Sequence, residues 1–168
     1  MIGRYGIYVL VIAGAFLSSC AMQYPQNAAE VRKEALADNF RTQMDSVVVN
    51  ASLDTVVKRV VDKSKQCLNY QVTVTGGGTV IINYQPELKS VSRNKKTLLI
   101  RTRFRQRTTF TEDDDVSGYA FVADMEKVSN NKTKVTTYSA YLEPDDEFHE
   151  AIITSAQGKK GACPYEDL

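Results

Sequence analysis

The segment LLIRTRFRQRTTF, residues 98–110, has an arginine at every second position from 101 to 107. Apolar side chains lie between or beside these arginines, at Leu98, Ile100, Phe104 and Phe110. Successive side chains of a β-strand point to opposite faces, so this segment would have one apolar face and one basic face. Such a strand needs its apolar face buried, which requires a sheet packed against a second layer.

Two helical segments and several further strands accompany this one. Residues 52–68 have apolar side chains at spacings of three and four, as in an amphipathic helix, and Ser52 is suited to cap it. The other predicted elements are strands at 46–50, 70–75, 79–84, 97–109, 116–128 and 132–142, and a C-terminal helix from 143 to about 157. The sequence therefore predicts an α+β fold, with a single antiparallel sheet of about five to six strands packed against an early and a C-terminal helix.

The N-terminus has the three parts of a bacterial export signal. Arg4 supplies a positive charge, residues 7–17 form an apolar run, and small residues precede a cysteine in Leu17-Ser18-Ser19-Cys20. This LSSC tetrapeptide resembles the lipobox of bacterial lipoproteins. The resemblance implies that residues 1–19 are a cleaved signal peptide and that Cys20 is lipidated.

The resemblance to lipoproteins also implies a location. In enteric bacteria an aspartate after the lipidated cysteine retains such proteins in the inner membrane, whereas this chain has Ala21. We therefore expect a lipid anchor in the outer membrane, at its periplasmic face. Residues 20–44 are polar and contain Pro25, which predicts a lipidated tether with a short helix at 28–40. Residues 45–168 are predicted to form the α+β periplasmic domain.

Two cysteines remain once Cys20 carries lipid. An even number of cysteines in an oxidising compartment favours a disulfide over two separate buried thiols. We therefore expect a bridge between Cys67 and Cys163. It would attach the C-terminal segment to the end of the helix predicted at 52–68.

The run VVVNASLDTVVKRVVD, residues 47–62, resembles the opening strand and helix of helix-grip domains. The order of elements over residues 45–157 is similar to that of the helix-grip modules of the BamC type. Those modules belong to lipoproteins of the outer-membrane barrel assembly machinery. The resemblance implies a helix-grip-like sheet and helices, and a role in binding other envelope proteins.

The sequence offers few candidates for catalysis or metal binding. His149 is the single histidine, and a metal site would combine it with Asp145 or Asp146. A solvated acidic helix N-terminus is the simpler interpretation. The acidic stretch 111–115 lacks the ligand spacing of a calcium loop. With both remaining cysteines assigned to a disulfide, we expect no catalytic residue, no metal, no cofactor and no enzymatic activity.

The candidate site for an anion or a partner is the arginine row, which we define as Arg101, Arg103, Arg105 and Arg107. A hairpin turn near residue 113 would place Arg103 opposite Asp124 in the next strand. The same register would place Arg101 opposite Glu126. Cross-strand pairs of this kind would be structural, which leaves Arg105 and Arg107 as the candidates for binding an anion.

Nucleic acid is not an expected partner. Loss of Arg4 from the 21 basic residues leaves a mature chain that balances its 20 acidic residues. No net field therefore attracts a polyanion, and no aromatic side chains interleave the basic face to stack on bases. The expected partners are the membrane, through the lipid anchor, and envelope proteins.

Two functions of different class follow. The first is a non-catalytic interaction module in a cell-envelope assembly. The alternative is a carrier or binder of a small apolar or anionic ligand, such as a lipid, lipopolysaccharide or a peptidoglycan fragment, in a groove between helix and sheet. An unfilled groove would favour the carrier, and its expected lining includes Tyr84, Phe121, Tyr138 and Ile152. A filled core would favour the interaction module.

Overall fold

The computed structural model describes residues 24–37, 42–68, 72–75, 79–107, 114–140 and 146–163. Its elements in chain order are α2 (Ala28–Leu36), β1 (Thr42–Val49), α3 (Leu53–Cys67), β2 (Val72–Thr75), β3 (Thr79–Ser92), β4 (Lys95–Arg107), β5 (Asp114–Ser129), β6 (Lys132–Ala140) and α4 (Asp146–Ala156). The predicted signal peptide, Cys20 and residues 21–23 lie outside the described residues.

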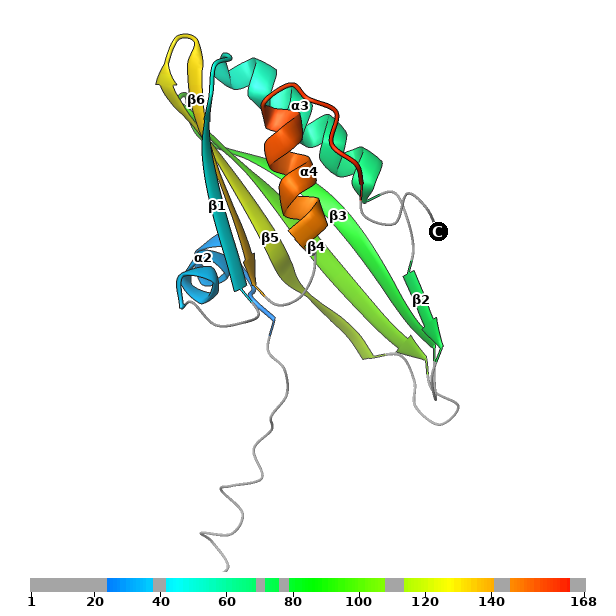
Figure 1. Cartoon of the computed structure of the whole chain (residues 1–168). Coiled ribbons are helices and arrows are strands. Elements are labelled where there is room, and N and C mark those ends of the chain that lie inside the picture. Colours follow the sequence, from blue (N-terminus) through cyan, green and yellow to red (C-terminus); the bar gives the residue numbers. More distant parts are fainter. Residues whose placement is uncertain are drawn as a thin grey trace, which may run out of the picture.

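The strands form one antiparallel sheet in the order β1-β6-β5-β4-β3-β2. The first strand therefore pairs with the last. Helices α3 and α4 cover one face of this sheet, which we call the front face, and α2 packs on the opposite back face (Figure 1). This arrangement confirms the predicted α+β, helix-grip-like fold.

The main hydrophobic core lies between the front face and the two helices. Val56 and Val60 of α3 and Ile152 of α4 are fully buried against the sheet. The rings of Phe121 on β5 and Phe148 on α4 meet edge to face, with their centroids 5.0 Å apart. Each such side chain stabilises the fold by about 1.5–3 kcal/mol through burial, so this interface holds α3 and α4 in place.

Helix α3 forms as the sequence predicts. The Ser52 hydroxyl accepts a hydrogen bond from the Thr55 backbone N–H at 3.4 Å, and Asp54 lies in the first turn, where a negative charge favours the helix dipole. The helix ends at Cys67, close to its predicted end.

Strand β3 is longer than predicted, because the polar stretch after Tyr84 continues the ladder to Ser92. The extended strand contains Pro86, which cannot donate a backbone hydrogen bond. In the structure, β2 pairs only with the first residues of β3, as far as Ile82. Pro86 therefore lies where β3 pairs with β4 alone among the described residues, and an edge of this kind is where a sheet tolerates proline.

The register between β4 and β5 differs from the prediction. It pairs Lys95 with Glu126, Thr97 with Asp124, Arg101 with Tyr119, Arg103 with Ser117 and Arg105 with Asp115. The predicted pairs Arg103–Asp124 and Arg101–Glu126 are therefore wrong. Asp114 starts β5 instead of belonging to the turn, and the register shifts again next to Ala120, which has no partner on β4.

The predicted boundary between tether and domain, at residue 45, also differs from the structure. A helix does form within the predicted tether, but it packs on the back face, with Val31 and Ala35 buried. Its apolar surface is small, so its sequence alone resembles a solvated linker. The packed part of the described chain therefore includes residues 24–37, well before residue 45.

The predicted disulfide is present. The sulfur atoms of Cys67 and Cys163 are 2.09 Å apart and their Cα atoms 5.0 Å apart. Both residues are buried, and the bridge spans 96 residues of sequence. It attaches the segment after α4 to the C-terminal end of α3.

Replacing both cysteines, as Cys67→Ser with Cys163→Ser, should lower the free energy of unfolding by about 2–4 kcal/mol, because the bridge restricts a long loop of the unfolded chain. Denaturant unfolding of the two forms measures this difference. The unreplaced chain in reducing agent is the matched control and should unfold like the double variant. Free thiols at both positions in protein isolated without reductant would contradict the bridge.

Candidate functional site

The back face carries a second, smaller apolar cluster where α2 docks. Leu99 of β4, Val122 of β5 and Ala140 of β6 are buried there against Val31 of α2. Asn27 caps the helix, because its side-chain oxygen accepts hydrogen bonds from the backbone N–H groups of residues 29 and 30, both at 3.0 Å. The cluster positions α2 across β5 and β6.

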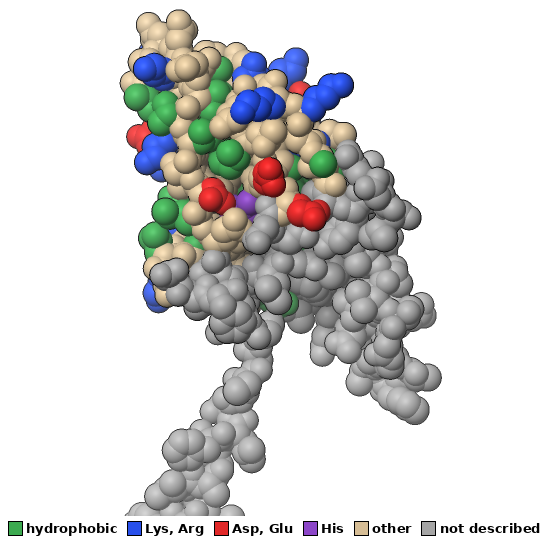
Figure 2. All heavy atoms as spheres, viewed as in Figure 1, with side chains coloured by type: hydrophobic (Ala, Val, Ile, Leu, Met, Phe, Trp, Pro, Cys, Tyr) green, Lys and Arg blue, Asp and Glu red, His purple; other side chains and the backbone are tan. Residues whose placement is uncertain are grey.

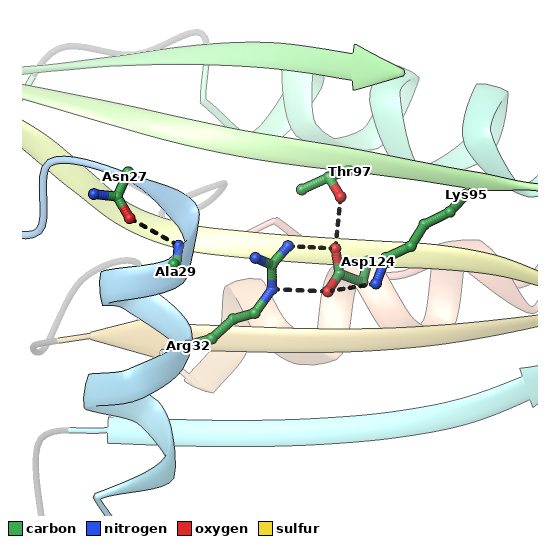
Figure 3. Close-up of polar contacts among 6 residues, drawn as sticks. All are labelled: Asn27, Ala29, Arg32, Lys95, Thr97 and Asp124. Atoms are coloured by element: carbon green, nitrogen blue, oxygen red, sulfur yellow. Dashed lines mark hydrogen bonds and ion pairs between the residues drawn. The ribbon is translucent and has the colours of Figure 1, made fainter. Parts of the chain in front are cut away.

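A charged network joins α2 to the sheet beside this cluster (Figure 3). The Arg32 guanidinium donates two hydrogen bonds to the Asp124 carboxylate, from Nε at 2.9 Å and from Nη2 at 2.7 Å. The Thr97 hydroxyl donates a third bond, at 2.6 Å, and the Lys95 ammonium lies 3.6 Å from the carboxylate. A two-pronged contact of this kind fixes orientation as well as charge, so Arg32 sets how α2 lies on the sheet.

The network keeps Asp124 ionised despite its burial. Burial by itself raises the pKa of this carboxyl group, but the hydrogen bonds from Arg32 and Thr97 and the charges of Arg32 and Lys95 outweigh it. The pKa of Asp124 therefore lies below its ordinary value of 3.8. Nearby, burial and the Asp124 charge together raise the pKa of Tyr138 above 10.0, although Arg32 opposes this.

The chain enters the domain at the middle of β5. The Pro25 carbonyl accepts a hydrogen bond from the Tyr119 backbone N–H at 2.7 Å. The Gln26 side chain donates to the Ser117 carbonyl at 3.0 Å. A side chain at Gly118 would overlap Tyr24, so glycine is required for this close approach. These contacts attach the segment before α2 to β5.

Arg101 and Arg103 of the arginine row lie on the back face, directly beside this entry point. Arg101 donates to the Ser117 hydroxyl at 3.2 Å, and the exposed Arg103 is paired in register with Ser117. Neither side chain forms an ion pair within the described part of the chain. The side chains of Arg105 and Arg107 lie outside the described residues, although the backbone register sets Arg105 opposite Asp115.

Sequence reasoning missed Arg32 as a site residue and assigned Asp124 to the wrong partner. One signal was available in the sequence. Asp124 lies in the run Phe-Val-Ala-Asp-Met, so the residues before and after it along the strand are apolar. An acid in such a run needs a compensating cation. The identity of that cation was not readable, since Arg32 lies 92 residues away in a segment that looks like a linker.

His149 is buried, which the interpretation as part of a solvated helix N-terminus did not anticipate. Its Nδ1 atom lies 3.1 Å from the Thr137 hydroxyl and 3.4 Å from a carboxylate oxygen of Asp45 on β1. Its ring packs edge to face on Phe121, with centroids 4.9 Å apart. Figure 2 shows the histidine in purple among acidic side chains on this face. Thr137 and Asp45 both approach the same ring nitrogen.

The described residues contain no group of three or more His, Cys, Asp or Glu side chains that could hold a metal ion. The metal interpretation paired His149 with Asp145, which lies outside the described residues, or with Asp146, whose side chain does. Among the helices of the described ranges, none has both the length and the apolar character needed to cross a membrane.

The four residues expected to line a carrier groove do not share one surface. Tyr84, Phe121 and Ile152 are buried in the front core, whereas Tyr138 lies on the back face beneath α2. At this part of the front face, the edge-to-face rings of Phe121 and Phe148 occupy the space between sheet and helix. The described portion of the interface is therefore packed by the chain's own side chains.

No family model matches this chain, and no curated protein matches it. Among solved structures, it is similar to a hypothetical protein from Helicobacter pylori, at 14% identity and a TM-score of 0.44, over 84% of this chain and 98% of that one. A conserved protein of unknown function from Enterococcus faecalis matches at 13% identity and a TM-score of 0.35, over 83% of this chain and 87% of that one. The major latex-like protein 151 of Panax ginseng matches at 11% identity and a TM-score of 0.28, over 70% of this chain and 94% of that one.

Replacing Arg32 with Ala should lower the free energy of unfolding by about 1.5–3 kcal/mol, because Asp124 then loses two charged hydrogen bonds while it stays buried. Amide hydrogen exchange in α2 should accelerate more than exchange in α3. Lys95→Ala is the control, since this partly exposed ammonium contributes only about 0–1 kcal/mol. Equal losses in the two variants would contradict the assigned role of Arg32.

The same network predicts a pH dependence. Since the folded pKa of Asp124 lies below the ordinary 3.8, its ionised form stabilises the fold above pH 3.8, and this contribution is lost as pH falls through the folded pKa. The stability difference between the unreplaced chain and Asp124→Asn should therefore be largest near neutral pH and shrink below pH 3.8. Denaturant unfolding across acidic pH measures it, and a constant difference would refute the assignment.

Proposed function

We propose that this chain is a lipoprotein at the periplasmic face of the outer membrane, where it acts as a non-catalytic interaction module of a cell-envelope assembly. The lipobox-like LSSC sequence supports the anchor at Cys20, and Ala21 supports the outer membrane. The observation that carries the proposal furthest is the docking of residues 24–37 on the back face, because it determines how the domain sits relative to its anchor.

The docked segment leaves a short connection to the anchor. Tyr24, the first described residue, already packs against Gly118, and residues 21–23 alone separate it from Cys20. Four successive Cα–Cα steps reach at most about 14 Å. The lipid anchor therefore holds the back face of the sheet near the bilayer, where a free tether over residues 20–44 would let the domain stand off.

This placement gives the arginine row a partner. Arg101 and Arg103 lie beside the point where the chain enters the domain, so the anchor brings them to the phosphate groups of the membrane surface. A basic side chain near an anionic surface contributes about 1 kcal/mol of binding. The lipid and the arginine row together would fix the domain's orientation on the membrane.

The far end of the sheet would then be available to a protein partner. Val48, Val91 and Val128 are 56%, 59% and 57% exposed. They lie near the β3–β4 and β5–β6 turns and the end of β1, and the Lys127 N–H to Asn94 carbonyl hydrogen bond, at 2.8 Å, ties the two turns together. Figure 1 shows the β5–β6 turn at the upper end of the sheet and α2 lower down. Exposed apolar side chains gathered at one end favour contact with a partner.

Replacing Cys20 with Ser should move the protein from the membrane fraction to the soluble fraction, because the lipid chains supply most of the membrane affinity. Cell fractionation and the intact mass of the purified chain measure this. Met22→Ser is the control and should keep the lipid mass and the membrane location. Unchanged membrane fractionation of Cys20→Ser would contradict the anchor.

A second arm of this experiment isolates the arginine row. In the released Cys20→Ser chain, adding Arg101→Ser with Arg103→Ser should weaken binding to phosphatidylglycerol vesicles about thirtyfold, the equivalent of two basic contacts. Lys58→Ser with Lys65→Ser removes the same charge from α3 and should have little effect. Equal weakening of vesicle binding by the two pairs of substitutions would show that binding depends on net charge alone and not on the position of Arg101 and Arg103.

Carriage of a small ligand is the second candidate function, and one observation favours it. The Thr102 hydroxyl is fully buried on the front face of β4, opposite Tyr84, and has no hydrogen-bond partner among the described residues. Leaving such a group unpaired costs about 1–3 kcal/mol, which a bound polar ligand would recover. A small molecule that co-purifies with the chain and is seen by native mass spectrometry would favour carriage over the interaction module.

A further inference from the structure

A hollow of about 580 Å³ opens on the front side of the molecule, between α3, the end of α4 and the segment that follows α4. Its lining includes Lys63 and Gln66 from α3, Ser155 from α4, and Lys159, Lys160 and Gly161 from the C-terminal segment. No Asp or Glu occurs among the described residues that line it. Figure 2 shows Lys and Arg side chains gathered over this part of the face. The volume is that of a small-molecule site.

The walls of the hollow are held by specific contacts. Gly158 ends α4 with a φ of +81°, and the Arg59 guanidinium donates from Nη1 to the Ala156 carbonyl at 3.2 Å, which ties the end of α4 to α3. Gly161 lies so close to the Ala151 backbone that a side chain there would meet it at 3.1 Å. The Cys67–Cys163 disulfide joins the residues that directly follow Gln66 and Ala162 of the lining. The shape of the hollow is therefore built into the fold.

Lys63 is the clearest sign of a ligand. Only 8% of this residue is exposed, although lysine is rarely buried without a counter-charge. Its ammonium donates to the Gln66 side-chain oxygen at 3.3 Å, and this neutral amide does not balance the charge. None of Lys63, Lys159 and Lys160 has a carboxylate partner within the described ranges. Three lysines thus line one hollow to which the described residues contribute no carboxylate.

We infer that this hollow binds the phosphate group of an anionic ligand. Lysine ammonium groups act as point charges toward phosphate oxygens, and three lysines line this hollow. The phosphate could come from a soluble molecule or from a lipid headgroup. The hollow lies on the opposite side of the sheet from α2, so a domain held by its back face would present the hollow away from the membrane. This orientation of the hollow is the only step that rests on the proposed function, and it favours a soluble ligand.

Inorganic pyrophosphate titrated calorimetrically into the full chain, purified in detergent without reductant, tests the site. Lys159→Gln with Lys160→Gln should weaken binding by about tenfold or more, the effect of losing at least one charged hydrogen bond. Both lysines are exposed, so this variant should fold normally. Lys58→Gln with Lys65→Gln removes the same charge from α3 outside the hollow and should change binding less than about twofold. Lys63→Met, checked by denaturant unfolding, should abolish binding.

Three results would overturn the inference. They are no pyrophosphate binding at low salt, equal weakening by the two lysine pairs, and full binding by a folded Lys63→Met chain. Vesicles of phosphatidylglycerol distinguish the source of the phosphate. The proposal of a soluble ligand would be overturned by one pattern of vesicle binding. In that pattern, pyrophosphate does not displace the vesicles and Lys159→Gln with Lys160→Gln reduces their binding. These readouts do not involve Cys20, so a failure of the site and a failure of the proposed anchor are separable.

Discussion

The packing of α2 on the back face of the sheet depends on one buried carboxylate. Asp124 lies in the middle of the sheet, where an uncompensated charge would destabilise the fold by several kcal/mol. Arg32 compensates it with two hydrogen bonds, and this contact brings a whole helix onto the sheet. Once α2 is in place, Leu99 and Val122 are buried and the sheet acquires a second apolar layer. A single charge pair thus turns a linker-like segment into part of the domain.

The docking of α2 also determines which part of the chain lies on the back face. Because α2 and the residues before it dock on β5, the first described residues lie on the back face, next to Arg101 and Arg103. The front face carries the main core, and beyond it lies the hollow, next to the Cys67–Cys163 bridge. The docked N-terminal segment and the basic hollow therefore lie on opposite sides of the sheet.

Local patterns predicted much of the fold. Helix α3 follows from its Ser52 cap and its apolar stripe, and the antiparallel strands follow from alternating side chains. The disulfide followed from counting cysteines. The β4–β5 register did not follow, because its turn and the unpaired Ala120 leave no clear trace in the residue pattern. The sequence pattern also did not predict that both faces of the sheet are covered. Leu98 and Leu99 are adjacent in the strand, so they point to opposite faces, and both are buried.

The sequence by itself determined the fold class, the cysteine pair and the basic face of β4, because each depends on periodicity or composition that is local to the chain. The tertiary structure alone decided which charges meet. Asp124 and Arg32 are 92 residues apart, and the lysines of the hollow come from α3 and from the segment after α4. Long-range charge pairing follows from how helices dock on a sheet, and docking is set by the whole packed core rather than by any one segment.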